Sequence, residues 1–172
     1  MQYVIVSDTH GDRGILVDIF KKYADTATQI FYNGDSELAA NDSVFTDVST
    51  VKGNMDFDFD FANEQTYQDD NVTVFQAHGH LLGVNTSLTS LLLRAEEVGA
   101  NIATFGHTHQ LGVEMINGIL AINPGSISQP RGQYSRLGGT YVVVTVENDK
   151  YKVQYCNREL APIANLHFSF NR

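Results

Sequence analysis

The stretch from Tyr3 to Asp12 reads Y-V-I-V-S-D-T-H-G-D, and the rest of the chain is interpreted outward from it. The apolar, β-branched run at positions 4–6 predicts a strand buried on both faces, as in a sheet covered by helices. Asp8 and His10 follow just past the carboxyl end of this strand, where open α/β sheets bind their ligands. A carboxylate and an imidazole two residues apart are also able to ligate one divalent metal.

The composition predicts one acidic, globular domain over residues 1–172. Hydrophobic residues make up 42% of the chain, which is enough to bury a core at this length. Eleven basic and twenty acidic residues give a net charge of −9. This balance disfavours a nucleic acid partner, because nonspecific binding to nucleic acid depends on neutralising many phosphates. It does not disfavour a small anionic substrate, since a metal supplies local positive charge.

The single cysteine and the lack of long apolar runs predict a cytoplasmic protein. Cys156 has no partner for an intramolecular disulfide, which favours a reducing compartment. The N-terminal residues lack the pattern of a signal peptide. No run approaches the ~20 apolar residues that span a bilayer, so no membrane partner is expected. A homo-oligomer is left open.

Hydrophobic periodicity predicts alternating strands and helices, followed by antiparallel strands. Strands are expected at residues 29–32, 48–52, 72–77 and 102–105. Helices are expected at residues 15–23, with Asp12 as the N-cap, and at 86–98. Two hairpins are expected from 112–116 with 119–122 and from 140–147 with 151–155. Residues 57–70 are interpreted as a loop, and 158–172 as an edge strand or a tail.

Five of the predicted strands end in polar clusters, namely Asp8/His10, Gly34-Asp35, Gly53-Asn54, His78/His80 and His107/His109. Each cluster alone has an ordinary explanation, since Gly-Asp and Gly-Asn are usually turns. If the strands lie side by side, however, four imidazoles, two carboxylates and an amide converge in one pocket. Burying so many polar groups together without partners would cost free energy. Two divalent metals would bind these groups and offset that cost. The absence of cysteine ligands favours Mn, Fe or Zn, and the resulting charge suits a phosphoryl group.

This ordered set resembles the calcineurin-like metallophosphoesterase superfamily, whose pattern is Asp-x-His, Gly-Asp, Gly-Asn, His and Gly-His-x-His. The strings S-D-T-H-G (7–11), H-G-H (78–80), G-H-T-H (106–109) and N-P-G-S (123–126) resemble more closely the small phosphodiesterases of the YfcE type. These share their fold with the retromer subunit Vps29. The resemblance covers residues 1–155. It implies an α/β (α+β) fold, a four-layer αββα sandwich of two mixed β-sheets flanked by helices.

The resemblance also implies a dinuclear metal site. Carried across by position, one ion would be held by Asp8, His10, Asp35 and His109. Asp35 would bridge to a second ion held by Asn54, His78 and His107. A metal-bridging hydroxide would attack phosphorus in line. Mn is the expected ion, and Fe, Zn, Ni or Co are alternatives.

The candidate catalytic residues are Asn54, Asp56 and His80. Many superfamily members have a His after Gly-Asn that protonates the leaving group, but this chain has Met55. A thioether does not donate a proton, so we expect a bias toward phosphoesters with acidic leaving groups. His80 is a candidate substitute for that proton donor or a phosphate contact, and an outer-shell role is an equal alternative. Arg131 is interpreted as an exposed loop residue rather than a phosphate contact.

The leading function is a metal-dependent phosphodiesterase that acts on small phosphoesters. The alternatives are a Vps29-like protein-binding scaffold with a vestigial site, and a small nuclease. All seven ligand positions are intact, which favours the enzyme over the scaffold. The small, acidic chain without a basic stretch disfavours the nuclease. Phe57, Phe59 and Phe61 are left open as a cover for the site, a subunit interface or part of the core.

Overall fold

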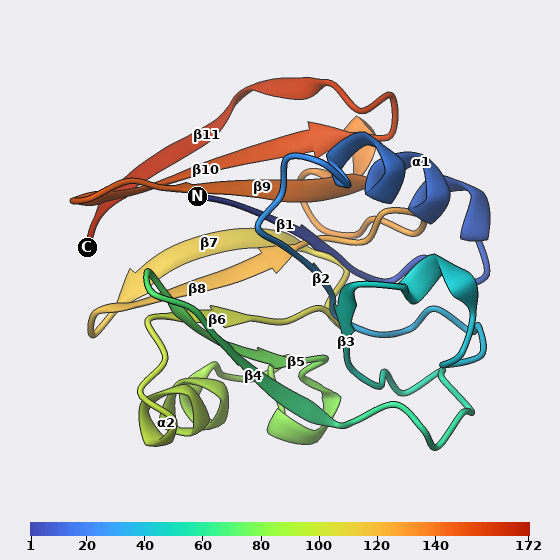
Figure 1. Ribbon diagram of the computed structural model, residues 1–172, viewed down its shortest axis with the longest axis horizontal. Coiled ribbons are helices and arrows are strands. Elements are labelled where there is room, and N and C mark those ends of the chain that lie inside the picture. The colour runs from blue at the N-terminus through green and yellow to red at the C-terminus, as the bar shows by residue number, and fades with distance from the viewer.

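The apolar run near the N-terminus forms β1 (Gln2–Val6), an inner strand of a six-stranded sheet. The computed structural model describes all of residues 1–172, and the strand order in this sheet is β11-β10-β9-β1-β2-β3 (Figure 1). The partners of β1 are parallel β2 (Gln29–Tyr32) and antiparallel β9 (Thr140–Val146). The remaining strands are β3 (Val48–Thr50), β10 (Lys150–Asn157) and β11 (Pro162–Asn171). This sheet is therefore mixed.

The second sheet has five strands in the order β4-β5-β6-β8-β7. Its three inner strands are parallel, namely β5 (Thr73–Ala77), β6 (Ile102–Thr104) and β8 (Ile119–Pro124). Its antiparallel edges are β4 (Glu64–Gln68) and β7 (Leu111–Ile116). The predicted hairpins are thus confirmed as β7–β8 and β9–β10, each slightly longer than expected.

One helix covers the outer face of each sheet, which gives the predicted four layers (Figure 1). The helix α1 (Arg13–Tyr23) begins as expected, because Asp12 Oδ1 accepts the Ile15 N–H at 3.3 Å. The helix α2 (Thr89–Glu97) begins three residues later than predicted. Residues 83–87 instead form a turn in which the N–H groups of Thr86 and Ser87 both donate to the Gly83 carbonyl. No helix is long and apolar enough to cross a membrane.

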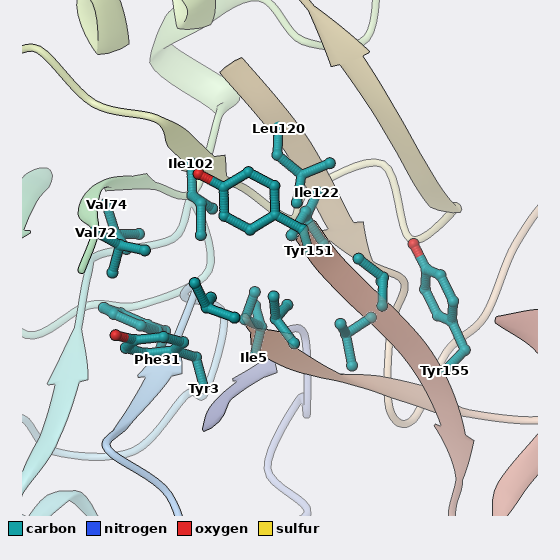
Figure 2. Close-up of a cluster of buried hydrophobic side chains, with 14 of the residues drawn as sticks. Tyr3, Ile5, Phe31, Val72, Val74, Ile102, Leu120, Ile122, Tyr151 and Tyr155 are labelled. Atoms are coloured by element: carbon teal, nitrogen blue, oxygen red, sulfur yellow. The ribbon is translucent and has the colours of Figure 1, made fainter. Parts of the chain in front are cut away.

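The main core lies between the two sheets (Figure 2). Tyr3, Ile5 and Phe31 from the first sheet are buried together with a set from the second sheet that includes Val74, Ile102, Leu120 and Ile122. These side chains occupy alternate positions of their strands, while the intervening ones face the helices, as the period of two in a strand requires. Continuous apolar runs such as β1 are explained by burial on both faces.

The interpretation of residues 57–70 as a loop is wrong for Glu64–Gln68, which form β4. This strand lies at an edge and pairs only with β5. Its polar side chains are largely solvated, so it carries no hydrophobic signal. Only Tyr67 packs inward, with its ring 5.5 Å from that of Phe31 in an edge-on contact. For residues 158–172 the edge-strand alternative is confirmed, because β11 pairs with β10.

Short 3₁₀ turns complete the secondary structure at Ser43–Phe45, His80–Leu82 and Ser135–Leu137. The three phenylalanines whose place was left open have different environments. Phe61 is 6% exposed and belongs to the core beneath α1, whereas Phe57 and Phe59 are 81% and 90% exposed. The aspartate between them, Asp58, is bound inward, because its Oδ2 accepts the Ala40 N–H at 2.8 Å. The two exposed rings therefore project from an anchored segment.

Candidate metal centre

The carboxyl ends of the parallel strands from both sheets meet at one place. The loops after β1, β2 and β3 carry the predicted ligands Asp8, His10, Asp35 and Asn54, and the loops after β5 and β6 carry His78, His107 and His109. Four of these residues form a tight group in which the ligand atoms all lie within 4.8 Å of one another: Asp8, His10, Asp35 and His109. The group therefore joins the first sheet to the second.

A second group adjoins the first through Asp35. The Nε2 atom of His78 lies 3.4 Å from Asp35 Oδ2 and 3.1 Å from Asn54 Oδ1. The ring of His107 lies 5.2 Å from that of His78, and its Nε2 is hydrogen bonded to the Asn85 amide nitrogen at 2.9 Å. His107 is thus near the group, but its outer nitrogen has a different neighbour in this conformation.

Hydrogen bonds fix the orientation of three imidazoles. The Nδ1 atom of His78 lies 2.6 Å from the Asn33 carbonyl oxygen, and that of His109 lies 2.8 Å from the Gln129 carbonyl oxygen. A carbonyl only accepts, so each Nδ1 carries the hydrogen and, in the neutral ring, Nε2 presents its lone pair to the centre. His10 Nδ1 faces the Glu37 carboxylate at 2.8 Å in the same way. Such outer partners are typical of histidines that bind metals.

The centre holds more acceptors than donors, and this fits a cation. The Nε2 atoms of His10 and His109 lie 3.2 Å apart, so two neutral rings would direct their lone pairs at each other. The Asp8 Oδ1 atom is buried without a hydrogen-bond donor, 3.3 Å from His109 Nε2. Either a proton or a metal ion would relieve this arrangement. Oxygen and nitrogen donors without thiolate are a suitable set for Mn, Fe or Zn.

Without a metal, the carboxylates raise the pKa of the two histidines nearest to them. Burial opposes protonation of His78, but the hydrogen bond that its ring donates to Asp35 and the charges of Asp8 and Asp35 outweigh it, so the pKa of His78 is raised. The pKa of His109 is raised for the same reason, with Asp8 as the partner. Burial together with the charge of His78 lowers the pKa of His80 and of His107. Protonation is thus favoured at the two histidines beside the carboxylates and disfavoured at the other two.

Most of the predicted ligands lie on strained backbone. Five of the seven predicted ligands have a positive φ angle between 46° and 65°, namely Asp8, His10, Asp35, His107 and His109. This left-handed conformation costs roughly 1–2 kcal/mol for a residue with a side chain. Glycines beside the ligands permit close packing. A Cβ atom on Gly53, for example, would lie 2.0 Å from Asp35 Oδ1.

Asp56 lies beneath the ligand loops rather than in the centre. Its buried carboxylate accepts the backbone N–H groups of Asp35, Ser36, Glu37 and Gly53 at distances of 2.8 to 2.9 Å. These bonds join the loop after β2 to the loop after β3. Both oxygens of Asp56 are therefore engaged in holding the backbone that carries Asp35 and Asn54.

The other predicted residues surround a pocket of about 320 Å³ or lie beside the second group. Met55 and Arg131 line the pocket, together with Glu37 and Gln129. The ring of His80 lies 5.3 Å from that of His78, and its Nδ1 is buried without a hydrogen-bond partner. Sequence reasoning missed Glu37, Asn85 and Gln129, because loop positions carry no periodic signal. Only the spacing of Glu37, two residues after Asp35, offered a hint.

Comparisons with known proteins match the chain to phosphoesterases. Residues 1–149 match the model of the calcineurin-like phosphoesterase superfamily domain. A probable metallophosphoesterase of Bacillus subtilis, YsnB, is 37% identical over 155 residues, which cover 90% of each chain. The crystal structure of a conserved protein from Streptococcus pneumoniae, described as a predicted phosphoesterase, is 33% identical. It superimposes with a TM-score of 0.96 over 99% of this chain and 97% of that one.

More distant structures share the fold. The phosphoesterase YfcE from E. coli has a TM-score of 0.63 at 20% identity over 98% of each chain. Vps29 of Entamoeba histolytica, solved with Zn²⁺, has a TM-score of 0.70 at 15% identity over 100% of this chain and 98% of that one. At these identities the likeness concerns the fold alone, and it confirms the predicted sandwich.

Proposed function

Because the chain belongs to the calcineurin-like phosphoesterase superfamily, we propose that it is a metal-dependent phosphodiesterase that hydrolyses small phosphoesters at a dinuclear site. Membership confirms the resemblance seen in the sequence. The preference for diesters and the number of ions are the proposal. The observation that carries it is the buried surplus of acceptors around Asp8 and His109, which a divalent cation would satisfy.

The ligands divide into two sets that share one carboxylate. Asp8, His10, Asp35 and His109 would hold one ion, and Asp35 with Asn54, His78 and His107 would hold the other. When bound, the ions would make water a nucleophile at neutral pH and offset the charge of the phosphoryl oxygens. We propose Mn as the native ion, since the donors are nitrogen and oxygen; Fe, Zn, Ni and Co suit the same donors.

Three further residues have distinct proposed roles. Asn54, whose Oδ1 lies beside His78, would help to hold the ion and would contact the substrate. His80 would donate a hydrogen bond to substrate, since its half-buried ring lies beside that of His78. Asp56 acts by positioning, because its oxygens are engaged by four backbone donors. Met55 lines the pocket and donates no proton, so aryl esters should be hydrolysed faster than alkyl esters at saturation.

The first experiment is hydrolysis of bis(p-nitrophenyl) phosphate by metal-stripped protein, with and without added Mn. Turnover that requires Mn and is lost in Asp35→Asn supports the proposal. The matched control is Asp18→Asn, which changes an exposed carboxylate on α1. No turnover with Mn, Ni, Co, Zn or Fe would overturn the proposal. Equal rates for alkyl and aryl diesters would contradict the role given to Met55.

A protein-binding scaffold is the second candidate, because the two exposed rings of Phe57 and Phe59 project from an anchored segment. It would become the leading candidate if every metal failed to support turnover. A nuclease is third, since the net charge of −9 opposes extended polyanions. The single buried thiol of Cys156 supports a reducing, cytoplasmic location.

A further inference from the structure

Arg131 is an unpaired cation at the mouth of the metal pocket. Its exposed side chain lines the pocket, and its guanidinium makes no hydrogen bond or ion pair. Most other arginines of the chain are engaged: Arg13 pairs with Asp42, Arg94 with Glu64 and Arg158 with Asp12. Only Arg136 is similarly free, and it does not line the pocket.

The backbone that carries Arg131 is fixed to the metal centre. The Arg131 N–H donates to the His109 carbonyl at 2.9 Å, while His109 Nδ1 donates to the Gln129 carbonyl at 2.8 Å. The Ser126 hydroxyl accepts the Gln129 N–H at 2.7 Å and donates to the Asp8 carbonyl at 2.7 Å. Hydrogen bonds to two predicted metal ligands, His109 and Asp8, thus fix the backbone at Arg131. A fixed backbone reduces the conformational entropy that Arg131 would lose on binding an anion.

Both carboxylates that line the pocket already have partners other than Arg131. Its two acidic lining residues are Asp35 and Glu37. Asp35 accepts the Met55 N–H at 2.7 Å and faces His78, and Glu37 faces His10 at 2.8 Å. A guanidinium binds phosphate or carboxylate through paired N–H donors. The natural partner of Arg131 is therefore an anion brought from outside.

The depth of the side chains separates this anion from the reacting phosphoryl group. Asp35 and His109 line the pocket and are 1% and 5% exposed, and the neighbouring Asp8 is 0% exposed. The Arg131 side chain lines the same pocket but is exposed. We propose that Arg131 forms a second anion-binding position beside the metal centre, so that the preferred substrate is a phosphodiester carrying another anionic group next to the bond that is cleaved. This inference rests on the proposed function and specifies its substrate class.

The test uses two chromogenic substrates that differ by one phosphate: the p-nitrophenyl ester of thymidine 5′-phosphate, and the same ester with a 3′-phosphate. We expect wild type to prefer the 3′-phosphorylated ester by about 10- to 100-fold in kcat/KM, mainly through KM, as for a charge-assisted hydrogen bond. Arg131→Met should remove this preference and leave the plain ester within about twofold. Arg131→Lys should restore part of it, and Arg136→Met is the matched control.

Several outcomes would overturn the inference: no preference in wild type, an equal loss in Arg136→Met, or a fall in kcat for both esters in Arg131→Met. The last would place Arg131 on the reacting phosphoryl group. Calorimetric binding of thymidine 3′,5′-bisphosphate and thymidine 5′-phosphate separates this inference from the proposed function. Wild type could hydrolyse neither ester and still bind the bisphosphate more tightly than thymidine 5′-phosphate, with Arg131→Met losing this difference. In that case the proposed phosphodiesterase function would be wrong and the anion-binding position of Arg131 would be supported. Equal binding by wild type and Arg131→Met would remove the anion position.

Discussion

The space between the two sheets has an apolar region and a polar region, and both are built on the same rows of alternating residues. On β5 the inward row begins with Val74, continues with Gln76 and reaches His78 just past the strand. On β6 it changes from Ile102 to Thr104. All five side chains are at most 2% exposed. The change from hydrocarbon to amide to imidazole takes place along one face of a strand.

The two regions hold the sheets together by different means. In the apolar region the contribution comes from buried area, which is not directional. In the polar region Gln76 Nε2 donates to the Tyr32 and Ser49 carbonyls at 2.9 and 3.1 Å, and Asn33 Nδ2 donates to Thr104 Oγ1 at 2.7 Å. Hydrogen bonds fix distance and direction. We infer that the apolar region supplies stability and the polar region positions the ligands.

Asp8→Asn should separate metal-dependent activity from the stability of the metal-free protein more than any other variant. Metal-dependent activity should fall by more than about 100-fold, since even outer-shell partners of a metal are worth about 10- to 100-fold. The melting temperature of the metal-free variant at pH 8 should not fall, because the buried oxygen without a donor loses its charge. Scanning calorimetry and a metal titration check both. A large loss of metal-free stability would contradict the separation.

Leu120→Ala, in the apolar region, should have the opposite effect, namely lower stability with unchanged metal binding. Leu120 is fully buried in the core between the sheets, so the free energy of unfolding should fall by about 2–5 kcal/mol. Metal affinity of the folded protein should be unchanged. Urea unfolding followed by metal titration measures these quantities, and Leu93→Ala, at a residue 54% exposed, is the neutral control. Weaker metal binding in Leu120→Ala would show that the regions are coupled.

Gln76→Leu tests the boundary between the regions. It leaves buried carbonyls and the Ser49 hydroxyl without their partner, which should cost about 1–3 kcal/mol of unfolding free energy. Gln76 Nε2 also donates to Asn33 Oδ1 at 3.1 Å, and the Asn33 carbonyl orients His78. Metal affinity should therefore also fall by about 10-fold. Val74→Ala, on the same face of β5, should lose stability without losing affinity. If the two variants behave alike, the polar region has no special positioning role.

The smallest expected effect concerns folding stability, whose dependence on pH should have opposite signs with and without bound metal. The folded-state pKa values of His78 and His109 are raised above the usual value near 6.5. Their contribution to metal-free stability is therefore complete below about pH 6.5 and is lost as the pH rises through the raised values. Metal binding needs both rings deprotonated, so metal affinity should rise over the same window. Denaturant midpoints between pH 6 and 9, measured with and without Mn, should diverge; parallel curves would contradict this.

Much of the fold was readable from the sequence, because its signals are local. The double burial of β1, the Asp12 cap and the two hairpin turns each depend on a few adjacent residues. The edge strand β4 was not readable, since its side chains are polar and its pairing with β5 is the only evidence for it. The start of α2 was misplaced because a turn at Gly83 competes with the helix.

The convergence of the proposed ligands was predictable for a similar reason, and their hydrogen-bond partners were not. Asp and His at the ends of successive strands converge once the strands are parallel, so the tight group was expected before its geometry was known. Glu37, Asn85 and Gln129 take their positions from loops, where contacts depend on the whole fold. The environment of Arg131 also depends on the whole fold. The sequence around it indicates an exposed loop, but only the structure places it at the pocket.

The left-handed backbone of the five proposed ligands has an evolutionary consequence. At these positions a glycine would relax the chain, although aspartate and histidine are among the residues that tolerate this conformation best. In a laboratory population selected only for heat resistance, we therefore expect the ligands themselves to be among the first residues replaced. Such a lineage would drift toward a robust but inert protein, and a screen that keeps catalysis must be applied in every round to prevent it.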